Sequence, residues 1–334
     1  MVPRRIVVPM VLLAGLGAGC EMKGVAYGDA NSIIAVMSQE LWQEASEDVY
    51  ATLEPTVFTV RDEKAFTVTY QEPYGQYWPD LRRFRQLLVV GTEADAWMQE
   101  ILERADTTLA EPGIHQVHDI WSIGQTVTLV LLDETGGADA LRQYLPQLAE
   151  LYEEQYRQFA RNRMFTSGVD TALADTLALE AGFTLYVPTV YRWSRTDSTY
   201  VFRNDNPDPS ELIREVVVTW TTPSLTRLDP ETLLDWRART VEASYSYPQD
   251  VILDPLLVDT VQVGELEALQ VQAQWRNPPD TGWPAAGPFI LRGITCPAQD
   301  RTYLVDAWLY APGAEKYEYM IQLETILDTF RCGP

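Results

Sequence analysis

The chain has 334 residues, 46% of them hydrophobic, which is more than a single core usually holds and predicts two domains. Its 48 acidic residues against 25 basic ones give a net charge of −23. A surface of this sign repels nucleic acid and anionic lipid head groups, so we expect no nucleic-acid partner.

Residues 1–19 have the order of a cleaved secretory signal. Arg4 and Arg5 precede an apolar run over residues 6–16, and small residues follow at 17–19. A helix that crosses a bilayer needs about 20 apolar residues, which is more than this run supplies. We therefore expect a signal peptide, with a retained membrane anchor as the alternative.

The signal ends at Cys20. This junction resembles the bacterial lipobox, in which the cysteine is lipidated, for example with palmitate, and becomes the first residue of the mature chain. Gly17 stands where that motif usually has Leu. The resemblance implies a lipid on Cys20 and, over the glycine-containing residues 20–30, a short tether to the membrane.

The first half repeats a strand followed by a helix. Ser38 can cap a helix in which Leu41, Ala45 and Val49 keep helical spacing. The predicted strands are 33–37, 87–90 and 127–132; the helices follow at Ser38, after Thr92 with Asp95, and over 138–164; further hairpin strands are expected at 57–60 with 66–70 and at 114–123. This alternation predicts a layered α/β domain with a mixed sheet over residues 31–165.

The second half, residues 166–334, is richer in strands. Asp229 can cap a helix that has Pro230 at its first position. The other predicted elements are a helix at 169–181, strands at 183–187, 199–203, 213–221, 268–275, 289–296 and 302–310, and a last helix with Met320, Leu323, Leu327 and Phe330 on one stripe. This order predicts an α+β domain, an antiparallel sheet with packed helices.

Two cysteines remain once Cys20 carries lipid. Cys296 ends a predicted strand and Cys332 follows the last helix. In an oxidising compartment an even pair of this kind predicts a disulfide that holds the helix to the sheet, and two buried thiols are the alternative.

The chain resembles, nearly end to end, the bacterial lipoproteins of domain of unknown function 4837. The resemblance is carried by Cys20, the strand-to-helix join over 33–41 with Trp42, the strand 183–188, a turn at Gly287, Pro288 and Phe289, and the exit at Tyr310, Ala311 and Pro312. The second half is also similar to the PsbP-like fold, through residues 182–188 and 303–330. Both resemblances imply a fold and supply no catalytic residue.

The sequence contains no motif of a catalytic nucleophile, phosphate loop or zinc protease. His115 and His118 are the only histidines, and on a strand residues three apart face opposite sides, so they do not share a metal. The acidic loop 204–208 lacks the glycine and closing Glu of a calcium loop. We therefore expect no cofactor and no metal, and a non-catalytic role, with a hydrolase that uses a pair of carboxylates as the alternative.

Aromatic and arginine residues gather in loops, and these types are enriched at binding surfaces. The candidates are Tyr74, Tyr77, Trp78, Arg82, Arg83 and Arg85 in a first loop, Trp275, Arg276 and Trp283 in a second, and Tyr245 and Tyr247 in a weaker third. The alternative is that these rings close the ends of the sheets.

The sequence thus predicts a lipoprotein of the cell envelope, on the periplasmic or outer-membrane face, that works as a non-catalytic binding or assembly module. Its expected partners are the membrane, through the lipid on Cys20, and another envelope protein. The competing hypothesis is a small-molecule or glycan binder, or a hydrolase, with a cleft between the domains.

Overall fold

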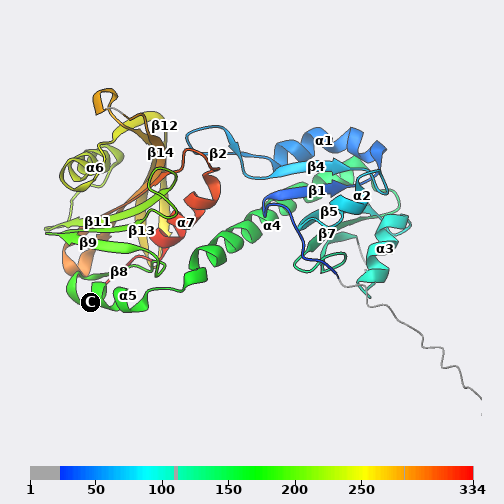
Figure 1. The fold of residues 1–334 in the computed structure, drawn as a ribbon, viewed down its shortest axis with the longest axis horizontal. Coiled ribbons are helices and arrows are strands. Elements are labelled where there is room, and N and C mark those ends of the chain that lie inside the picture. The colour runs from blue at the N-terminus through cyan, green and yellow to red at the C-terminus, as the bar shows by residue number, and fades with distance from the viewer. Residues whose placement is uncertain (1–22, 109–111, 282, 334) are drawn as a thin grey trace, which may run out of the picture.

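The computed structural model describes residues 23–108, 112–281 and 283–333. The predicted signal peptide and Cys20 lie outside these residues. Figure 1 shows two sheets with their own helices, joined by the long helix α4 (Ala138–Met164). The strand order is β4-β1-β5-β7-β6 in the first sheet and β12-β13-β14-β15-β11-β10-β9 in the second. The predicted combination of an α/β and an α+β half is confirmed.

The first sheet is mixed, as predicted. The parallel strands are β4 (Thr67–Gln71), β1 (Ser32–Val36), β5 (Gln86–Thr92) and β7 (Thr126–Leu132), and β6 (Gly113–His118) runs antiparallel to β7. The middle strands are apolar runs because helices cover both of their faces.

Alternate residues along β1 point to opposite faces of the first sheet and pack into two separate hydrophobic cores. Ile33 and Ala35 pack with α1 (Gln39–Leu53) and α4, whereas Ile34 and Val36 pack with α3 (Ala96–Arg104). The period-2 alternation of a strand divides them in this way. The short helix α2 (Trp78–Leu81) lies on the α3 side, and α4 runs through Pro146 without a break.

Three local predictions in the first half are wrong. The hairpin expected between 57–60 and 66–70 does not form, because β4 pairs in parallel with β1, and only β2 (Thr56–Val57) and β3 (Glu63–Lys64) make a small hairpin. The strand expected over 114–123 ends at His118, where Asp119 takes a φ of 56°. The second helix, expected to begin at a capping box of Thr92 and Asp95, starts instead at Ala96 with Asp95 as its N-cap residue, and the Asp95 carboxylate accepts the Thr92 N–H at 2.7 Å.

Residues 23–30, predicted as part of a tether, pack on the first half. Ile123 donates its N–H to the Gly24 carbonyl at 2.8 Å, and Ala26 donates to the Ile123 carbonyl at 2.9 Å. The Tyr27 hydroxyl donates to the Asp80 carbonyl. These hydrogen bonds leave only residues 20–22, outside the described part, to connect the predicted lipid to the fold.

The second sheet is antiparallel throughout. Its strands are β9 (Arg192–Thr196), β10 (Thr199–Asn204), β11 (Ile213–Thr221), β12 (Asp250–Val263), β13 (Leu266–Arg276), β14 (Ala286–Cys296) and β15 (Arg301–Tyr310). The helices α5 (Thr171–Glu180) and α7 (Tyr317–Asp328) cover one face, and α6 (Pro230–Ser244) covers the other. Short 3₁₀ turns lie at Phe165–Ser167, Pro279–Thr281 and Pro297–Gln299.

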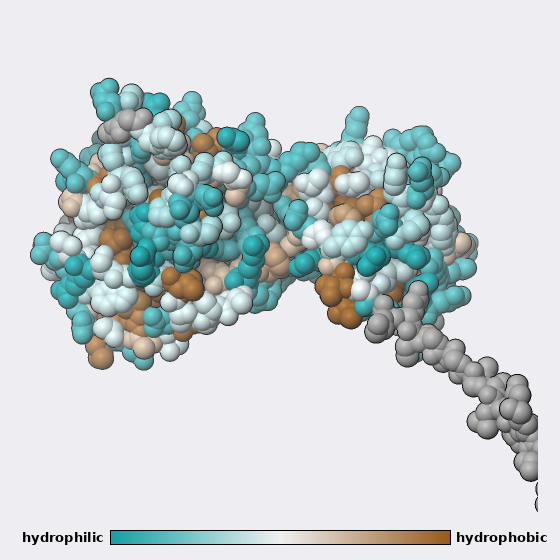
Figure 2. All heavy atoms as spheres, viewed as in Figure 1, coloured by the Kyte–Doolittle hydropathy of each residue, from teal (hydrophilic) through white to brown (hydrophobic). Residues whose placement is uncertain are grey.

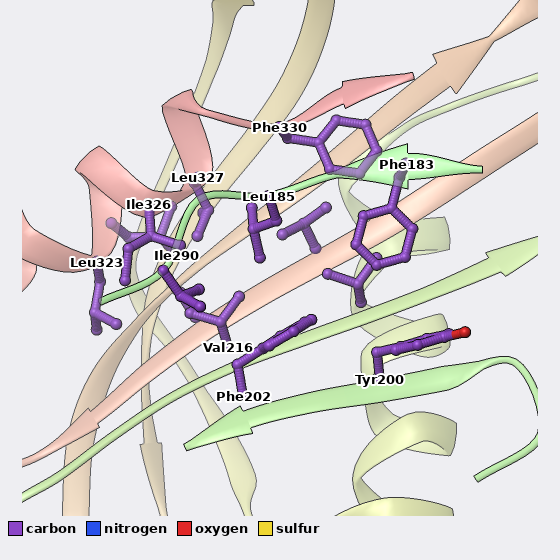
Figure 3. Packing of buried hydrophobic residues seen from close by; sticks show 14 of the residues in the cluster. Phe183, Leu185, Tyr200, Phe202, Val216, Ile290, Leu323, Ile326, Leu327 and Phe330 are labelled. Carbon is purple, nitrogen blue, oxygen red and sulfur yellow. The ribbon is translucent and has the colours of Figure 1, made fainter. Parts of the chain in front are cut away.

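The core under α7 contains closely packed aromatic rings. Figure 3 shows Phe183 and Phe330 side by side, and their rings stack at 5.7 Å between centroids. Next to them β8 (Phe183–Thr184) pairs with β16 (Arg331–Cys332). The predicted disulfide between Cys296 and Cys332 is present, with 5.9 Å between the Cα atoms, so the chain end is bonded to the sheet.

Three predictions for the second half are also wrong. The strands β9 and β12 were not predicted, and the strand expected over 183–187 is reduced to β8. Gly287, Pro288 and Phe289 belong to β14 and form no turn. Pairing between β14 and β15 begins at Phe289, so the missing N–H of Pro288 removes no hydrogen bond from that ladder.

The two halves contact each other through α4, α7 and the loop between β2 and β3. Lys316 Nζ lies 3.0 Å from Glu63 Oε1, and Arg157 Nη1 lies 2.7 Å from Glu324 Oε2. Gln274 of β13 donates to the carbonyl oxygen of Thr59 at 2.6 Å. These contacts join residues far apart in sequence at several points along the boundary.

Candidate functional site

An apolar hollow of about 520 Å³ opens on the second half, and we call it the aromatic hollow. It is lined by Asp208, Pro209, Ser210, Ile213, Tyr247, Trp275, Asn277, Trp283, Ala285, Trp308 and Tyr310. Five of these residues are aromatic, and Asp208 is the one carboxylate among them. A hollow of this kind accepts an apolar group with little desolvation of charge.

Trp283 stands at the rim of the aromatic hollow and is 74% exposed. Asn277 holds the loop that carries it, since its N–H donates to the Ala285 carbonyl and its Nδ2 donates to the Trp283 carbonyl, both at 2.8 Å. Asn277 Oδ1 is buried and accepts no hydrogen bond from the described residues. The hollow therefore has an exposed ring at its rim, while this acceptor lies buried beside it.

The floor of the hollow is made by Trp275 and Trp308, which meet edge to face at 5.3 Å between centroids. Trp275 donates its indole N–H to the Leu309 carbonyl at 3.2 Å. A Cβ at Gly287 would lie 2.7 Å from that indole nitrogen and 1.7 Å from the Leu309 oxygen. Glycine at 287 thus allows the close approach that fixes the floor.

Below the floor lies a buried ionic cluster. Glu215 accepts the indole N–H of Trp308 at 3.1 Å and binds Arg203 Nη1 at 2.8 Å. Arg237 Nε lies 2.8 Å from Asp306 Oδ2, and the Tyr245 hydroxyl donates to the same carboxylate oxygen. Side chains of Arg237 and Asp306 are both 0% exposed, so this pair is sealed from solvent.

The Arg237 guanidinium is held by contacts of two kinds. Its carbon lies 3.9 Å from the centroid of the Phe289 ring, and Nη2 donates to the amide oxygen of Gln249. The ion-pair distance to Asp306 is short, although the Nε–H does not point along it, and Asp306 Oδ1 lacks a partner among the described residues. In a buried ion pair each charge offsets the other, so removing one member leaves the other as an uncompensated buried charge.

Burial dominates the pKa values of this cluster. Burial raises the pKa of Glu215, and the Arg203 ion pair opposes the rise only in part. Burial also raises the pKa of Asp306 against the opposing charge of Arg237. The pKa of Tyr245 is raised well above its usual value by burial and by the neighbouring Asp306. Trp308 separates the two carboxylates from the hollow, so they support its floor and do not reach a ligand.

The six candidate residues of the first loop lie in different environments in the structure. Tyr74 and Tyr77 are 55% and 63% exposed, but Trp78 is buried against Trp121. The Arg85 guanidinium packs on the Phe159 ring of α4, at 5.5 Å from its centroid. Arg82 and Arg83 line a separate hollow on the outer surface of the first half, so the six residues do not form one binding surface.

The second and third loops come together at the aromatic hollow. Trp275 and Trp283 of the second loop and Tyr247 of the third line it. Arg276 is exposed and does not line it, and Tyr245 is used below the floor, stacked on Trp308 at 6.0 Å. The alternative was that these rings only close the ends of the sheets. Trp275, which is 2% exposed, fits this alternative, whereas the exposed Trp283 does not.

The predicted metal candidates have other roles. Asp205 of the acidic loop binds Arg192 and Arg203, and Asp208 accepts the Ser210 N–H at 2.7 Å. His118 Nδ1 lies 3.4 Å from the Thr126 hydroxyl. Within the described ranges no group of three or more His, Cys, Asp or Glu residues is arranged to hold a metal ion.

A larger hollow, about 870 Å³, lies between α4 and the second half. Its lining includes Glu150, Glu154, Arg161, Asp328 and Arg331, and none of its lining residues, all from the described part, is a tryptophan. The predicted glycan cleft would need an aromatic platform beside its carboxylates. Tyr186, which is 41% exposed, is the one aromatic ring of its lining, so the hollow combines carboxylates with a single tyrosine and none of the tryptophans that the glycan hypothesis calls for.

Sequence reasoning missed Trp308, Tyr310 and Asn277 of the hollow, and the cluster below it. A signal was present, because Asp306 and Glu215 each interrupt a strongly apolar strand. A charged residue in such a run is buried with a partner or marks a site. The partners themselves depend on pairing between β11 and β15, which the sequence does not display.

Residues 170–329 match the family model of domain of unknown function DUF4837. The resemblance predicted from the sequence is confirmed over this range, which is the second half and not the chain from end to end. No curated protein matches the chain. In the part of the chain that the structure describes, no helix is long and apolar enough to cross a membrane.

Solved structures similar to part of the chain have low identity. The Ran-binding protein Mog1p of Saccharomyces cerevisiae, with 14% identity and a TM-score of 0.31, covers 45% of this chain and 90% of its own. LpqN of Mycobacterium tuberculosis, described as involved in cell envelope biogenesis, has 12% identity and a TM-score of 0.28 over 46% of this chain and 83% of its own. Human STARD10 has 9% identity and a TM-score of 0.20, over 47% of this chain and 74% of its own.

Proposed function

We propose that this protein, whose residues 170–329 match the DUF4837 model, is a lipid-anchored, non-catalytic binding module of the bacterial envelope. Its partner is another envelope protein, which inserts an apolar side chain into the aromatic hollow. Residues 31–165 act as the membrane-side domain and residues 166–334 as the binding domain.

The observation that carries this proposal is the composition of the hollow. Trp275 and Trp308 form a rigid, buried floor, while Trp283 stays exposed at the rim. Buried aromatic pockets with an exposed ring beside them are typical of the residues that dominate protein interfaces. The volume of about 520 Å³ suits one or two large side chains of a partner.

The edge strand β12 favours a protein over a small ligand. It lies at the end of the second sheet, and Val251 near its start pairs with Trp275 of the hollow. Leu253, Leu257 and Val258 on this strand are 61%, 45% and 47% exposed. An exposed apolar edge is a place where a partner chain can add a strand, and a protein benefits when such an edge is covered.

Native mass spectrometry of the lipidated protein, extracted from its own cells in mild detergent, tests the proposal. We expect a co-isolated protein subunit with the wild type and its loss in Trp283→Ala. The matched control is Trp193→Ala, since Trp193 is 45% exposed on the opposite edge strand β9.

A bound small mass without a protein subunit would contradict this proposal and support the competing small-molecule binder. Subunit capture that is equal in Trp283→Ala and in the wild type would remove the aromatic hollow as the binding site.

A further inference from the structure

The hollow on the first half that Arg82 and Arg83 line has a volume of about 300 Å³ and is basic. It is lined by Lys23, Gly24, Arg82, Arg83, Arg104, Ile120 and Trp121, and we call it the basic hollow. Four cationic side chains and no carboxylate line it, in a chain with a net charge of −23. Such a local reversal of sign marks a surface for an anion.

The charges of the basic hollow are largely available. Among the described residues no ion pair within 4.0 Å involves Lys23, Arg82 or Arg83, and Arg104 is paired with Glu100 at 3.1 Å. Lys23 Nζ donates to the backbone carbonyl of Asp119.

Arg83 is held in place over the start of the described chain. Its guanidinium lies 5.8 Å from the centroid of the Tyr27 ring, and a Cβ at Gly24 would meet its Nη2 at 2.7 Å. Trp121 is 8% exposed and its indole N–H has no partner among the described residues. Arg83 is thus held beside the hollow, where its guanidinium can donate charge-assisted hydrogen bonds to a phosphate group.

The position of the basic hollow along the chain identifies the anion. Only two residues separate Lys23 from Cys20, and the three steps along the chain span at most about 11 Å. Hydrogen bonds to Ile123 fix residues 24–26 to the fold. If Cys20 carries lipid, as the proposed function requires, this surface lies at the bilayer whatever the rest of the molecule does.

Apolar side chains flank the basic hollow. Val25 is 73% exposed and Ile123 is 54% exposed, and the two are bridged backbone to backbone. Figure 2 shows hydrophobic surface at the lower edge of the first half. Exposed aliphatic residues beside Lys and Arg are the combination that binds the boundary between head groups and acyl chains.

We infer that the basic hollow, with Val25 and Ile123, docks on the anionic phosphate head groups of the membrane that holds Cys20. The acidic remainder of the surface is repelled by the same membrane, so the protein takes one orientation. Figure 1 shows the second half at the other end of α4 from the sheet of the first half, and the aromatic hollow lies on the second half, so it is held away from the docked face.

Hydrogen exchange of the lipidated protein in lipid nanodiscs tests this inference. The discs contain phosphatidylcholine alone or mixed with phosphatidylglycerol, and the intact mass first establishes the lipid on Cys20. We expect slower exchange over residues 23–28 and 119–124 on the anionic discs, and loss of this protection at high salt.

The double variant Arg82→Gln/Arg83→Gln leaves Lys23, beside the cleavage site, unchanged. Each basic residue near an anionic surface adds roughly fivefold to the association constant, so the docking equilibrium constant falls by roughly 25-fold and the protection falls with it. Arg239→Gln, an exposed arginine on α6, is the matched control and keeps the protection.

Equal exchange on the two kinds of disc, with Cys20 lipidated, would overturn this inference and leave the proposed function standing. Inorganic phosphate or glycerol phosphate that gives the same protection on phosphatidylcholine discs would also overturn it, because the hollow would then bind a soluble anion. An intact mass without lipid would instead contradict the anchoring on which the proposed function rests.

Discussion

Trp308 and Glu215 face each other on the paired strands β15 and β11, and the indole N–H of Trp308 donates to the carboxylate over 3.1 Å. One ring therefore belongs to two environments, the apolar floor of the aromatic hollow and the ionic cluster below it. The rigidity of the floor depends on the charges beneath, and the first two predictions concern them.

Replacing one member of the Arg237–Asp306 pair should be costly. Arg237→Met leaves a carboxylate buried with only the Tyr245 hydroxyl, and we expect the free energy of unfolding to fall by about 3–5 kcal/mol. The double variant Arg237→Met/Asp306→Leu should recover at least about 2 kcal/mol, because no uncompensated charge remains. Urea denaturation of the three proteins checks this, and a double variant less stable than Arg237→Met would contradict the account.

Glu215 should give the stability a specific pH dependence. Its pKa is raised by burial above the usual 4.5, although Arg203 opposes the rise. An acid of this kind contributes stability that is present below its unfolded pKa and is lost as the pH rises through the folded pKa. In Glu215→Gln, urea unfolding between pH 4.5 and neutrality should therefore show a smaller decline of stability with rising pH.

Asp205 provides the contrasting case for the same measurement. Burial favours its protonation, but the hydrogen bond from Arg203 and the charge of Arg192 outweigh burial and lower its pKa below 3.8. Its contribution is present above that value and is lost as the pH falls through the folded pKa. Asp205→Asn should thus lower the free energy of unfolding at neutral pH and reduce its further fall at the acidic end of the profile, and a changed slope near neutrality would count against this assignment.

Loss of the disulfide should destabilise the second half. The bond between Cys296 and Cys332 closes a loop with a sequence separation of 36 residues, and a loop of this size corresponds to about 4 kcal/mol. Cys296→Ser/Cys332→Ser should lower the free energy of unfolding by this amount in a urea titration. Alkylation of both cysteines in the unreduced, denatured wild type would show that the bond is absent.

The contact between Lys316 and Glu63 should couple the two halves. Lys316 is 5% exposed, its Nζ is ion-paired with Glu63, and its backbone N–H donates to the same carboxylate at 2.6 Å. Lys316→Met should cost about 3 kcal/mol and separate the melting of the halves into two calorimetric transitions. The exposed Arg142 is the control, and Arg142→Met should change stability little.

The regular elements with a buried face were predictable from the sequence. The strands β5 and β7 and the helices α1 and α4 follow apolar runs or helical spacing that burial imposes. The strand β12 was missed because it is an edge strand, exposed along most of its length and containing Pro255. Hydrogen bonding to β13 makes this segment a strand, although its residue pattern does not predict one.

The candidate site was predictable in part. Trp275 and Trp283 were identified by the density of rings and prolines around them, but Trp308 and Tyr310 come from a strand that the sequence presents as ordinary core. Trp78 was misjudged because burial against Trp121 depends on a loop more than forty residues later. Contacts set by long-range pairing are not visible in local composition.

The most direct test of the account is site-specific photo-crosslinking in the cell envelope. A photoreactive phenylalanine analogue replaces Trp283 at the rim of the aromatic hollow, and the same analogue replaces Trp193 as the control. The account predicts one major crosslinked envelope protein from position 283 and none in common with position 193. Crosslinks from position 283 that match those from position 193, or none at all, would contradict the proposal that the aromatic hollow binds a partner protein.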